Sequence, residues 1–475
     1  MRTNQNVLPM NLKLAYAMPA FALAMVGIPV YVFIPKFYTD VVGVDIAVVG
    51  FLLFGVRIFD AVTDSMMGWW SDRTRSAMGR RRPFILFGAL LLAVGVLFLF
   101  RPPMVAEAST NTVWFAFWIY AVFLFWTVTA VPYEALGPEL SRHYDDGTTL
   151  FMLRDGFLIG GTLVAAASPA MVRWIWGLDG SPEEVRTAFL IMGLLYAPVL
   201  VGACAWCVYR LREQRPLPDA GRIHLFESLR GMRRNRPFLI LLAAFTVSAL
   251  GSNLPAALIL YYVQYVLRTS GAELFLLLFF VTGIVFLPLW RIVAGRVGKK
   301  HAWLISLGVN AVVFLAIFFL GPGDVVAYGV LVVVSGVGFG AVLALPSALQ
   351  ADVIDYDELI SGRRREGQYM GLWSVAKKMT AAVGVGVGLA AMGMAGYVLN
   401  ATQGPSVEWT IRIFYALIPS LCNVAAIAIA LRYPLSGERH REVIAAIDRI
   451  RAGGAAADPL RPGVMVCRDR MACVI

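Results

Sequence analysis

Residues 46–70 read IAVVGFLLFGVRIFDAVTDSMMGWW, an almost wholly apolar run that includes only three charged residues. A helix needs about 20 such residues to cross the hydrocarbon core of a bilayer. In a strand of an outer-membrane barrel, apolar and polar residues would instead alternate over about ten positions. The run therefore predicts a transmembrane helix.

Runs of this kind recur along the whole chain. Of its 475 residues, 59% are hydrophobic and only 15% are charged, whereas a soluble domain of this size exposes far more charge. The composition predicts an all-α membrane protein with about twelve transmembrane helices. The expected spans are 14–36, 46–70, 84–100, 112–136, 151–171, 187–209, 238–266, 273–295, 303–321, 325–350, 369–397 and 409–432.

The net charge of +11 invites a nucleic-acid interpretation, but the basic residues lie mostly in short loops between spans. One set of loops is rich in Arg and Lys, for example 71–83 and 210–237, and the alternate set holds few. Such a bias marks the cytoplasmic side of a membrane protein. We therefore expect no nucleic-acid partner, a location in the cell inner (plasma) membrane, and cytoplasmic termini.

The longest polar interruption, 210–237, divides the spans into six and six. The expected organisation is a half over 1–209, a cytoplasmic loop over 210–237, a half over 238–433 and a cytoplasmic tail over 434–475. VPYEALGPELSRHYDD (131–146) follows the fourth span, and the similar LPSALQADVIDYDE (345–358) follows the tenth. Repeats of six spans are how one class of transporter folds is built, so we expect two six-helix pseudo-repeats.

Two further features concern packing and the tail. Glycines 336, 338, 340, 384, 386 and 388 allow helix backbones to approach closely.

In the tail, Val443, Ile444, Ile447 and Ile450 share one helical face, which predicts a short helix on the cytoplasmic membrane surface. Beyond Gly453 we expect disorder.

The second span contains the charged residues that most strongly suggest a functional site. Arg57, Asp60 and Asp64 follow an i, i+3, i+7 spacing and project from one face, and Thr63 adds a hydroxyl. A charge at bilayer depth is costly and marks a functional site by default. Two carboxylates and a hydroxyl suit a small hard cation, or a proton if one acid becomes a proton acceptor. The structural alternative is an Asp60–Arg57 pair that locks helices together.

Four segments resemble a known family: YTDVVG (38–43), RIFDAVTDSMMGWWSDRTRSAMGRRRPFI (57–85), VPYEALGPEL (131–140) and REGQYMGLWSVAKKM (365–379). They are similar, in order and over nearly the whole chain, to the glycoside–pentoside–hexuronide:cation symporters. This is the melibiose-permease-like branch of the major facilitator superfamily. The resemblance implies a secondary active transporter that works by alternating access and couples a sugar, glycoside or related small solute to Na⁺ or H⁺.

The resemblance also implies roles for particular residues. Asp60, Asp64, Thr63 and a fourth-span threonine, Thr127, match the cation site of the family. Arg154 and Lys378 match an arginine and a lysine that connect the sugar and cation sites, with Lys377 as the neighbouring alternative to Lys378.

The sugar site of the family matches poorly. Its two galactoside-binding aspartates align with Ala24 and Ala130, and its two tryptophans align with Glu134 and near Leu343. Since sugar recognition needs convergent hydrogen bonds to hydroxyls, a galactoside is disfavoured. Glu134 stays a candidate substrate-site residue beside Arg57. A lysolipid or other amphiphile is the alternative substrate.

The loop SDRTRSAMGRRRP (71–83) is a candidate gating loop. Gly68 and Asp72 open it, and Arg80 belongs to its arginine cluster, so charge pairs with neighbouring spans can bias which face is open. The alternative is that the arginines only fix topology. RIVAGRVGKKH (291–301) is the matching loop of the second half.

Other classes of function fit less well. The four histidines lie in loops or the tail, and no nucleophile–base constellation occurs, so we expect no enzyme. A non-transporting receptor or scaffold would not need the two acids. We expect a monomer in the lipid bilayer that binds a small-molecule substrate and a coupling cation, Na⁺ or H⁺, with no cofactor and no other metal.

Overall fold

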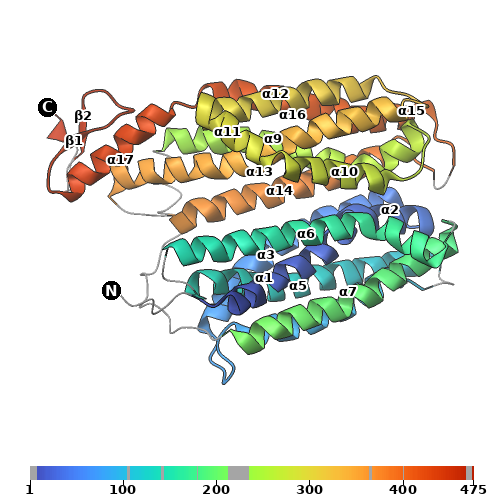
Figure 1. Cartoon of the computed structure of the whole chain (residues 1–475). Helices are drawn as coiled ribbons and strands as arrows, with labels where there is room; N and C mark the ends of the chain where they lie inside the picture. Colours follow the sequence, from blue (N-terminus) through green and yellow to red (C-terminus); the bar gives the residue numbers. More distant parts are fainter. Residues whose placement is uncertain are drawn as a thin grey trace. The chain divides into compact units, whose positions relative to one another are not determined.

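The structure is a computed structural model of the 475-residue chain, and it describes residues 8–103, 107–140, 144–178, 180–211, 235–362, 366–398, 401–466 and 473–474. Most of these residues are helical (Figure 1). The first elements are α1 (Met10–Ile28), η1 (Pro29–Phe33), α2 (Ile34–Lys36), η2 (Phe37–Val41), α3 (Ile46–Arg73), α4 (Arg82–Phe100), α5 (Ala108–Leu140), α6 (Tyr144–Trp176) and α7 (Pro182–Arg210).

The chain continues with α9 (Arg236–Tyr261), η3 (Tyr262–Val266), α10 (Ala272–Val285), α11 (Leu287–Val297), α12 (Lys299–Phe318), α13 (Val325–Ser361), α14 (Glu366–Met394), α15 (Pro405–Arg412), η4 (Ile413–Leu417), α16 (Ile418–Leu431) and α17 (Gly437–Arg451). A small antiparallel sheet of order β1-β2-β3 ends the chain, formed by β1 (Ala456–Ala457), β2 (Val464–Val466) and β3 (Cys473–Val474).

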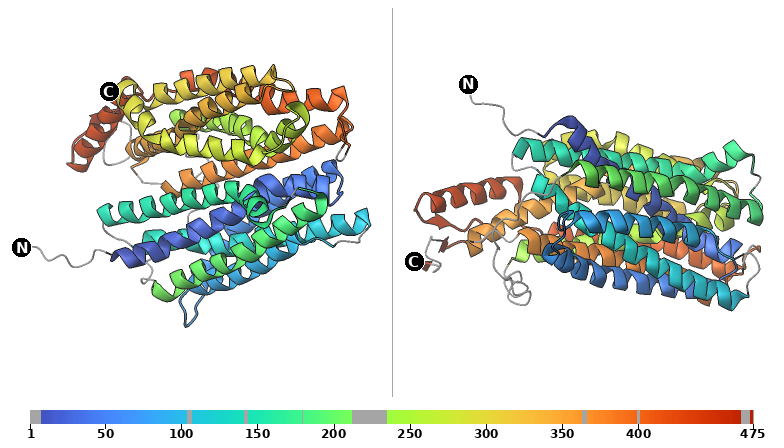
Figure 2. Two further views of the ribbon diagram at one scale, coloured as in Figure 1. Left: turned by 45° about the vertical axis from the view of Figure 1, so that its right-hand side comes forward. Right: turned by 90° about the horizontal axis from the view of Figure 1, so that it is seen from below.

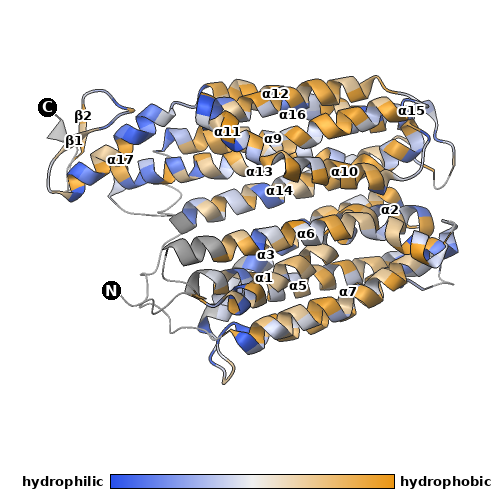
Figure 3. Cartoon of the chain, viewed as in Figure 1, coloured by the Kyte–Doolittle hydropathy of each residue, from blue (hydrophilic) through white to orange (hydrophobic). Residues whose placement is uncertain are grey.

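The expected transmembrane helices are confirmed. Within the described ranges, 11 helices are long and apolar enough to cross a membrane, or up to 12 if α10 and α11 form one bent span. Apolar residues cover most of the length of these helices, and polar residues gather toward their ends (Figure 3). The chain is therefore a multi-span α-helical membrane protein.

Prolines lie at two of the irregular places. The α10–α11 pair bends by 45° next to Pro288, because proline lacks the N–H of the helical ladder and its ring clashes with the preceding turn. The π-helical segment η4 ends at Leu417, two residues before Pro419. Wider i→i+5 turns suit a helix in which one hydrogen bond is missing.

The chain forms two compact units. The first comprises Met1–Leu217, Ala256–Leu277 and Val385–Ile411. In it α1 packs on α6 and α7, and α4 packs on α5 and α7, as both views of Figure 2 allow the reader to follow. Helix α3 packs on α5, and this pair carries the acids of the second span. The expected boundaries at 209, 237 and 433 stay a prediction.

The second unit comprises Pro218–Pro255, Leu278–Gly384 and Arg412–Ile475. Its buried core joins α9, α11, α12, α13, α14, α16 and α17. A Cβ placed on Gly336 would lie 2.7 Å from the Phe279 carbonyl oxygen, and one on Gly340 would lie 2.8 Å from the Gly283 carbonyl oxygen. Close backbone approach at these glycines, as expected from the sequence, is confirmed.

The short helix expected in the tail is confirmed as α17, but its expected placement on the membrane surface and the expected disorder beyond Gly453 were wrong. Val443 and Ile447 are buried in the core of the second unit, where α17 packs on α13. Arg451 pairs with Glu358 of α13 at 2.6 Å. Helix α13 runs to Ser361 rather than to residue 350, so its extra turns offer α17 a protein surface in place of lipid. Strands β1–β3 occupy part of the region expected to be disordered.

Candidate functional site

The acids of the second span are positioned by the start of their helix. Asp45 caps α3, because its Oδ1 accepts hydrogen bonds from the backbone nitrogens of Ala47 at 2.9 Å and Val48 at 3.1 Å. A side-chain oxygen at this position satisfies N–H groups that would otherwise lack partners. The cap fixes where α3 begins, and the packing of α3 on α5 sets the neighbour that Asp60 and Asp64 meet.

Thr127 of α5 brings the two acids together. Its Oγ1 lies 3.0 Å from Oδ1 of Asp60 and 2.9 Å from Oδ1 of Asp64. The two carboxylate oxygens are therefore no more than about 6 Å apart. Asp60 is 5% exposed and Thr127 is 1% exposed. Three oxygens from two helices thus meet in a buried place inside apolar spans.

Thr63 is oriented differently. Its hydroxyl lies 3.0 Å from the carbonyl oxygen of Phe59 and 3.2 Å from that of Asp60, so it donates to its own helix. Such back-bonding is usual for a threonine inside a helix. The Thr63 oxygen keeps lone pairs that can ligate a cation, so its place in the cation site stays a prediction.

The guanidinium of Arg57 lies over aromatic rings. Its guanidinium carbon lies 3.9 Å from the ring centre of Tyr31 and 5.2 Å from that of Phe123. The structure gives no Arg57–Asp60 ion pair among the residues it describes, whereas Asp60 contacts Thr127. The geometry favours the oxygen cluster over the locking pair that the spacing alone left open.

The other candidate substrate-site residues lie at several places. Glu134 is exposed and follows Thr127 by seven residues, on the same face of α5. Arg154 of α6 pairs with Asp155 at 2.7 Å and lies 5.0 Å from the Phe151 ring centre. These contacts do not test the roles expected of Glu134 and Arg154, which stay predictions.

The two lysines of α14 differ in exposure. Lys378 is half-buried, whereas Lys377 is exposed. This difference favours Lys378 as the lysine that faces the protein interior, although its role also stays a prediction.

The candidate gating loop is described in part. The side chain of Asp72 lies outside the described residues. A Cβ on Gly68 would meet only Val131, at 3.8 Å, so packing does not require a glycine there. Arg80 is half-buried, and Arg82 donates from Nε to the Val208 carbonyl oxygen at 2.7 Å. The loop thus contacts α7, and its gating role stays a prediction.

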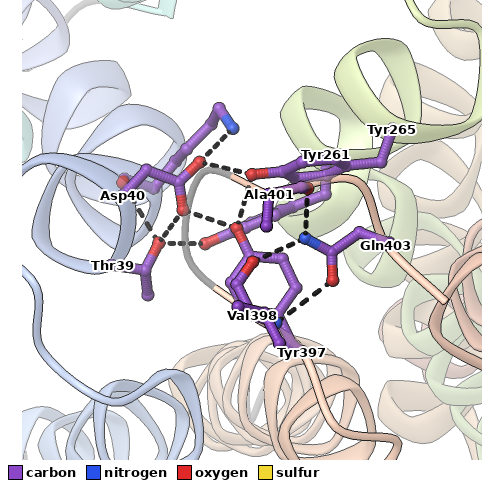
Figure 4. Close-up of polar contacts among 9 residues, drawn as sticks. Thr39, Asp40, Tyr261, Tyr265, Tyr397, Val398, Ala401 and Gln403 are labelled. Atoms are coloured by element: carbon purple, nitrogen blue, oxygen red, sulfur yellow. Dashed lines mark hydrogen bonds and ion pairs between the residues drawn. The ribbon is translucent and has the colours of Figure 1, made fainter.

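A second polar cluster, which the sequence did not single out, surrounds Asp40 at the end of the first span. Tyr397 donates to Oδ1 of Asp40 at 2.5 Å, and Tyr265 donates to Oδ2 at 3.1 Å. Lys36 pairs with Oδ2 at 2.6 Å, and Thr39 lies 3.0 Å from the Tyr261 hydroxyl. Figure 4 shows how these side chains, from distant parts of the chain, converge on one carboxylate. We call Lys36, Thr39, Asp40, Tyr261, Tyr265 and Tyr397 the Asp40 network.

The charged groups of the Asp40 network have hydrogen-bonding and aromatic partners. Burial and the neighbouring Asp40 carboxylate raise the pKa of Tyr397 well above its ordinary value, so its hydroxyl stays protonated and donates. Lys36 also lies over the rings of Tyr261 and Tyr265, 4.9 and 5.0 Å from their centres. The motif YTDVVG (38–43) includes Thr39 and Asp40. The first span was expected to end at residue 36, so the sequence placed both residues outside the membrane-spanning helix.

Comparisons with known proteins agree with this architecture. The family model described as MFS/sugar transport protein matches residues 15–437. The chain belongs to this family. It is therefore a transporter and not an enzyme, and the resemblance to the sugar:cation symporters is confirmed.

Individual relatives are distant but cover nearly the whole chain. The glucuronide carrier protein homolog of Escherichia coli strain K12 is 27% identical over 436 residues, covering 90% of this chain and 92% of that protein. The isoprimeverose transporter of Lactiplantibacillus pentosus is 25% identical, covering 90% and 89%. A crystal structure of a nucleoside transporter shares the fold, with a TM-score of 0.64, 15% identity, and coverage of 88% of this chain and 99% of that one.

Proposed function

We propose that the protein is a symporter that moves a sugar or glycoside together with Na⁺ or H⁺. Asp60, Asp64 and Thr127 hold the coupling cation. The names of the relatives, which are carriers of a glucuronide and of isoprimeverose, support a sugar-like substrate.

The observation that carries this proposal is the contact of one hydroxyl with two carboxylates. A threonine hydroxyl has a single proton to donate, yet Thr127 Oγ1 lies within 3.0 Å of an oxygen of Asp60 and of an oxygen of Asp64. It can donate to only one of them. The two contacts together therefore suit a site that takes up a proton on one carboxyl or a cation ligated by the oxygens.

The same charges explain coupling. Two carboxylates held within about 6 Å repel each other strongly inside apolar spans, where little water screens them. A cation bound between them lowers this repulsion and favours the packing of α3 on α5. Cation binding therefore changes the stability of the conformation in which the site is closed, which is what a coupled transporter requires.

The Asp40 network supports alternating access. We infer that it lies at the outer side of the membrane, since one span separates it from the basic loop 71–83. Its contacts tie η2 to η3 and Tyr397, and so close the protein at that end. Opening toward the outside would break the bonds to Asp40 and expose the Lys36–Asp40 pair to water.

The charge bias of the loops supports the orientation. The basic loops would face the cytoplasm, with both termini on that side and the protein in the inner (plasma) membrane. A monomer remains the expected state.

Uptake into proteoliposomes tests this function. Purified protein would be supplied with labelled methyl glycosides under an inward Na⁺ gradient or, separately, an inward proton gradient. We expect accumulation above equilibrium with one of the two gradients. Uptake that only equilibrates under both gradients would make the protein a uniporter and would refute the coupling.

A further inference from the structure

Arg57 lies near the middle of the span Ile46–Ser71 and is half-buried. A guanidinium is charged at every physiological pH. At this depth such a charge is costly unless an anion or water compensates it. The surroundings of Arg57 therefore indicate what it is there to bind.

The contacts that the protein makes with the Arg57 guanidinium are with aromatic rings. Its carbon lies over the ring of Tyr31, 3.9 Å from the ring centre, and over that of Phe123 at 5.2 Å, so both are cation–π contacts. Across the part of the chain that the structure describes, Arg57 has no hydrogen bond and no ion pair. Its N–H donors, which form a planar fork matched to carboxylates, are thus unused by the protein.

Asp60 and Asp64, both of which the structure describes, lie on the same helix face as Arg57, but neither of them forms an ion pair with its guanidinium. Asp60 and Asp64 both contact Thr127 of the neighbouring helix, at 3.0 and 2.9 Å. The cation site and the arginine are therefore separate features of one face, and the positive charge of Arg57 is not consumed by the cation site.

Aromatic rings continue on one side of Arg57. Tyr31 meets Phe123 edge-on, with ring centres 5.7 Å apart, and Trp126 at 6.2 Å. A Cβ on Gly27 would lie 3.2 Å from the Trp126 ring, so the absence of a side chain there lets the indole pack closely. Apolar walls with a few oriented polar groups are typical of small-molecule sites.

We propose that the transported sugar or glycoside carries a carboxylate or sulfonate group, and that Arg57 binds this group through its N–H fork. The rings of Tyr31 and Trp126 contact the apolar faces of the sugar ring. This inference rests on the proposed transport of sugars and adds the charge class of the substrate.

Matched pairs of sugars that differ only at C6 test the inference. The pairs are methyl β-D-glucoside with methyl β-D-glucuronide, methyl β-D-galactoside with methyl β-D-galacturonide, and glucose with sulfoquinovose. Binding is measured by calorimetry on purified protein, and uptake is measured in proteoliposomes. For at least one pair we expect the anion to bind roughly 10- to 100-fold more tightly, the range for a hydrogen-bonded charge.

Substitutions of Arg57 test whether this residue causes the preference for the anionic sugar. Arg57→Gln should bring the two affinities of the preferred pair to within about twofold, because the charge and most of the donors that discriminate tenfold or more are lost. Arg57→Lys should keep a reduced preference, because the charge remains but the fork is lost. Arg101→Gln, which removes an exposed arginine at the end of α4, is the matched control and should leave the ratio unchanged. Monodispersity on size-exclusion chromatography checks that each variant is folded.

Three results would overturn the inference. Equal affinities within every pair for the unaltered protein would refute it while sparing sugar transport. A folded Arg57→Gln protein that keeps the preference, or loses both members of a pair equally, would assign the anion to another residue or give Arg57 a structural role. Failure to bind or transport any of the six sugars would refute the proposed function, and the inference with it.

Discussion

Replacing Thr127 by valine removes the hydroxyl that contacts both acids while nearly keeping the shape of the side chain. A hydrogen bond to a charged group contributes about 1.5–3 kcal/mol. Losing one ligand oxygen should therefore weaken cation binding by roughly 10- to 100-fold, since 1.4 kcal/mol corresponds to a factor of ten. The carboxylates, which at about 6 Å repel by roughly 3 kcal/mol at an effective dielectric constant of about 20, would be held together less well.

The assay is the dependence of initial uptake rate on the concentration of the coupling cation in proteoliposomes. For Thr127→Val we expect a half-saturating concentration about 10- to 100-fold higher. Thr129→Val is the matched control, because the buried Thr129 hydroxyl donates to the Phe125 carbonyl oxygen of its own helix at 2.8 Å. Equal cation dependence in Thr127→Val, Thr129→Val and the unaltered protein would refute the role of Thr127.

Three further changes test other parts of the account. Asp64→Asn should abolish accumulation against a gradient while sparing exchange of labelled substrate at equal concentrations; full accumulation would contradict the cation site. Tyr397→Phe removes a hydrogen bond to Asp40 and should increase labelling of an outer-side reporter cysteine roughly five- to tenfold, as expected for a loss of about 1 kcal/mol or more; unchanged labelling would count against an outer gate. Gly386→Ala places a Cβ 2.7 Å from that of Phe54 and should lower the unfolding temperature, with an overpacking cost of about 1–3 kcal/mol. Gly371→Ala meets nothing within 4 Å, and an equal effect of both alanines would contradict the packing.

The spans were predictable because a membrane allows few backbone solutions. All backbone groups must be satisfied inside the segment, so a long apolar run becomes a helix. The run at 46–70 begins where α3 begins, at Ile46. Helix α13 was underestimated because its last turns are charged: Asp352 pairs with Lys299 at 2.6 Å, and a sequence does not show that these charges are paired.

The cation site was predictable to the extent that it lies on one helix. The spacing of Asp60 and Asp64 places both on one face, and the resemblance supplied Thr127. The spacing could not tell which way the Thr63 hydroxyl points, since a helix offers its own carbonyls as partners. The packing of α17 on α13 was missed for a related reason, because an amphipathic face does not say whether lipid or protein covers it.

The Asp40 network was missed because it joins residues that are far apart in the chain. Asp40 and Tyr397 are 357 positions apart, and neither is conspicuous in its own segment. A lone aspartate just beyond an expected span is ordinarily interpreted as a loop residue. Only the pairing with tyrosines of two other segments reveals a buried polar cluster.

The most direct test of cation coupling is to measure the ion rather than the substrate. Proteoliposomes without any ion gradient would receive a downhill gradient of the preferred glycoside, and the entry of ²²Na⁺ or protons would be recorded. The account predicts that substrate entry carries the ion with it, and that the Asp60→Asn/Asp64→Asn protein moves substrate without the ion. Substrate flux that moves neither ion in the unaltered protein, or ion movement that persists in the double variant, would contradict it.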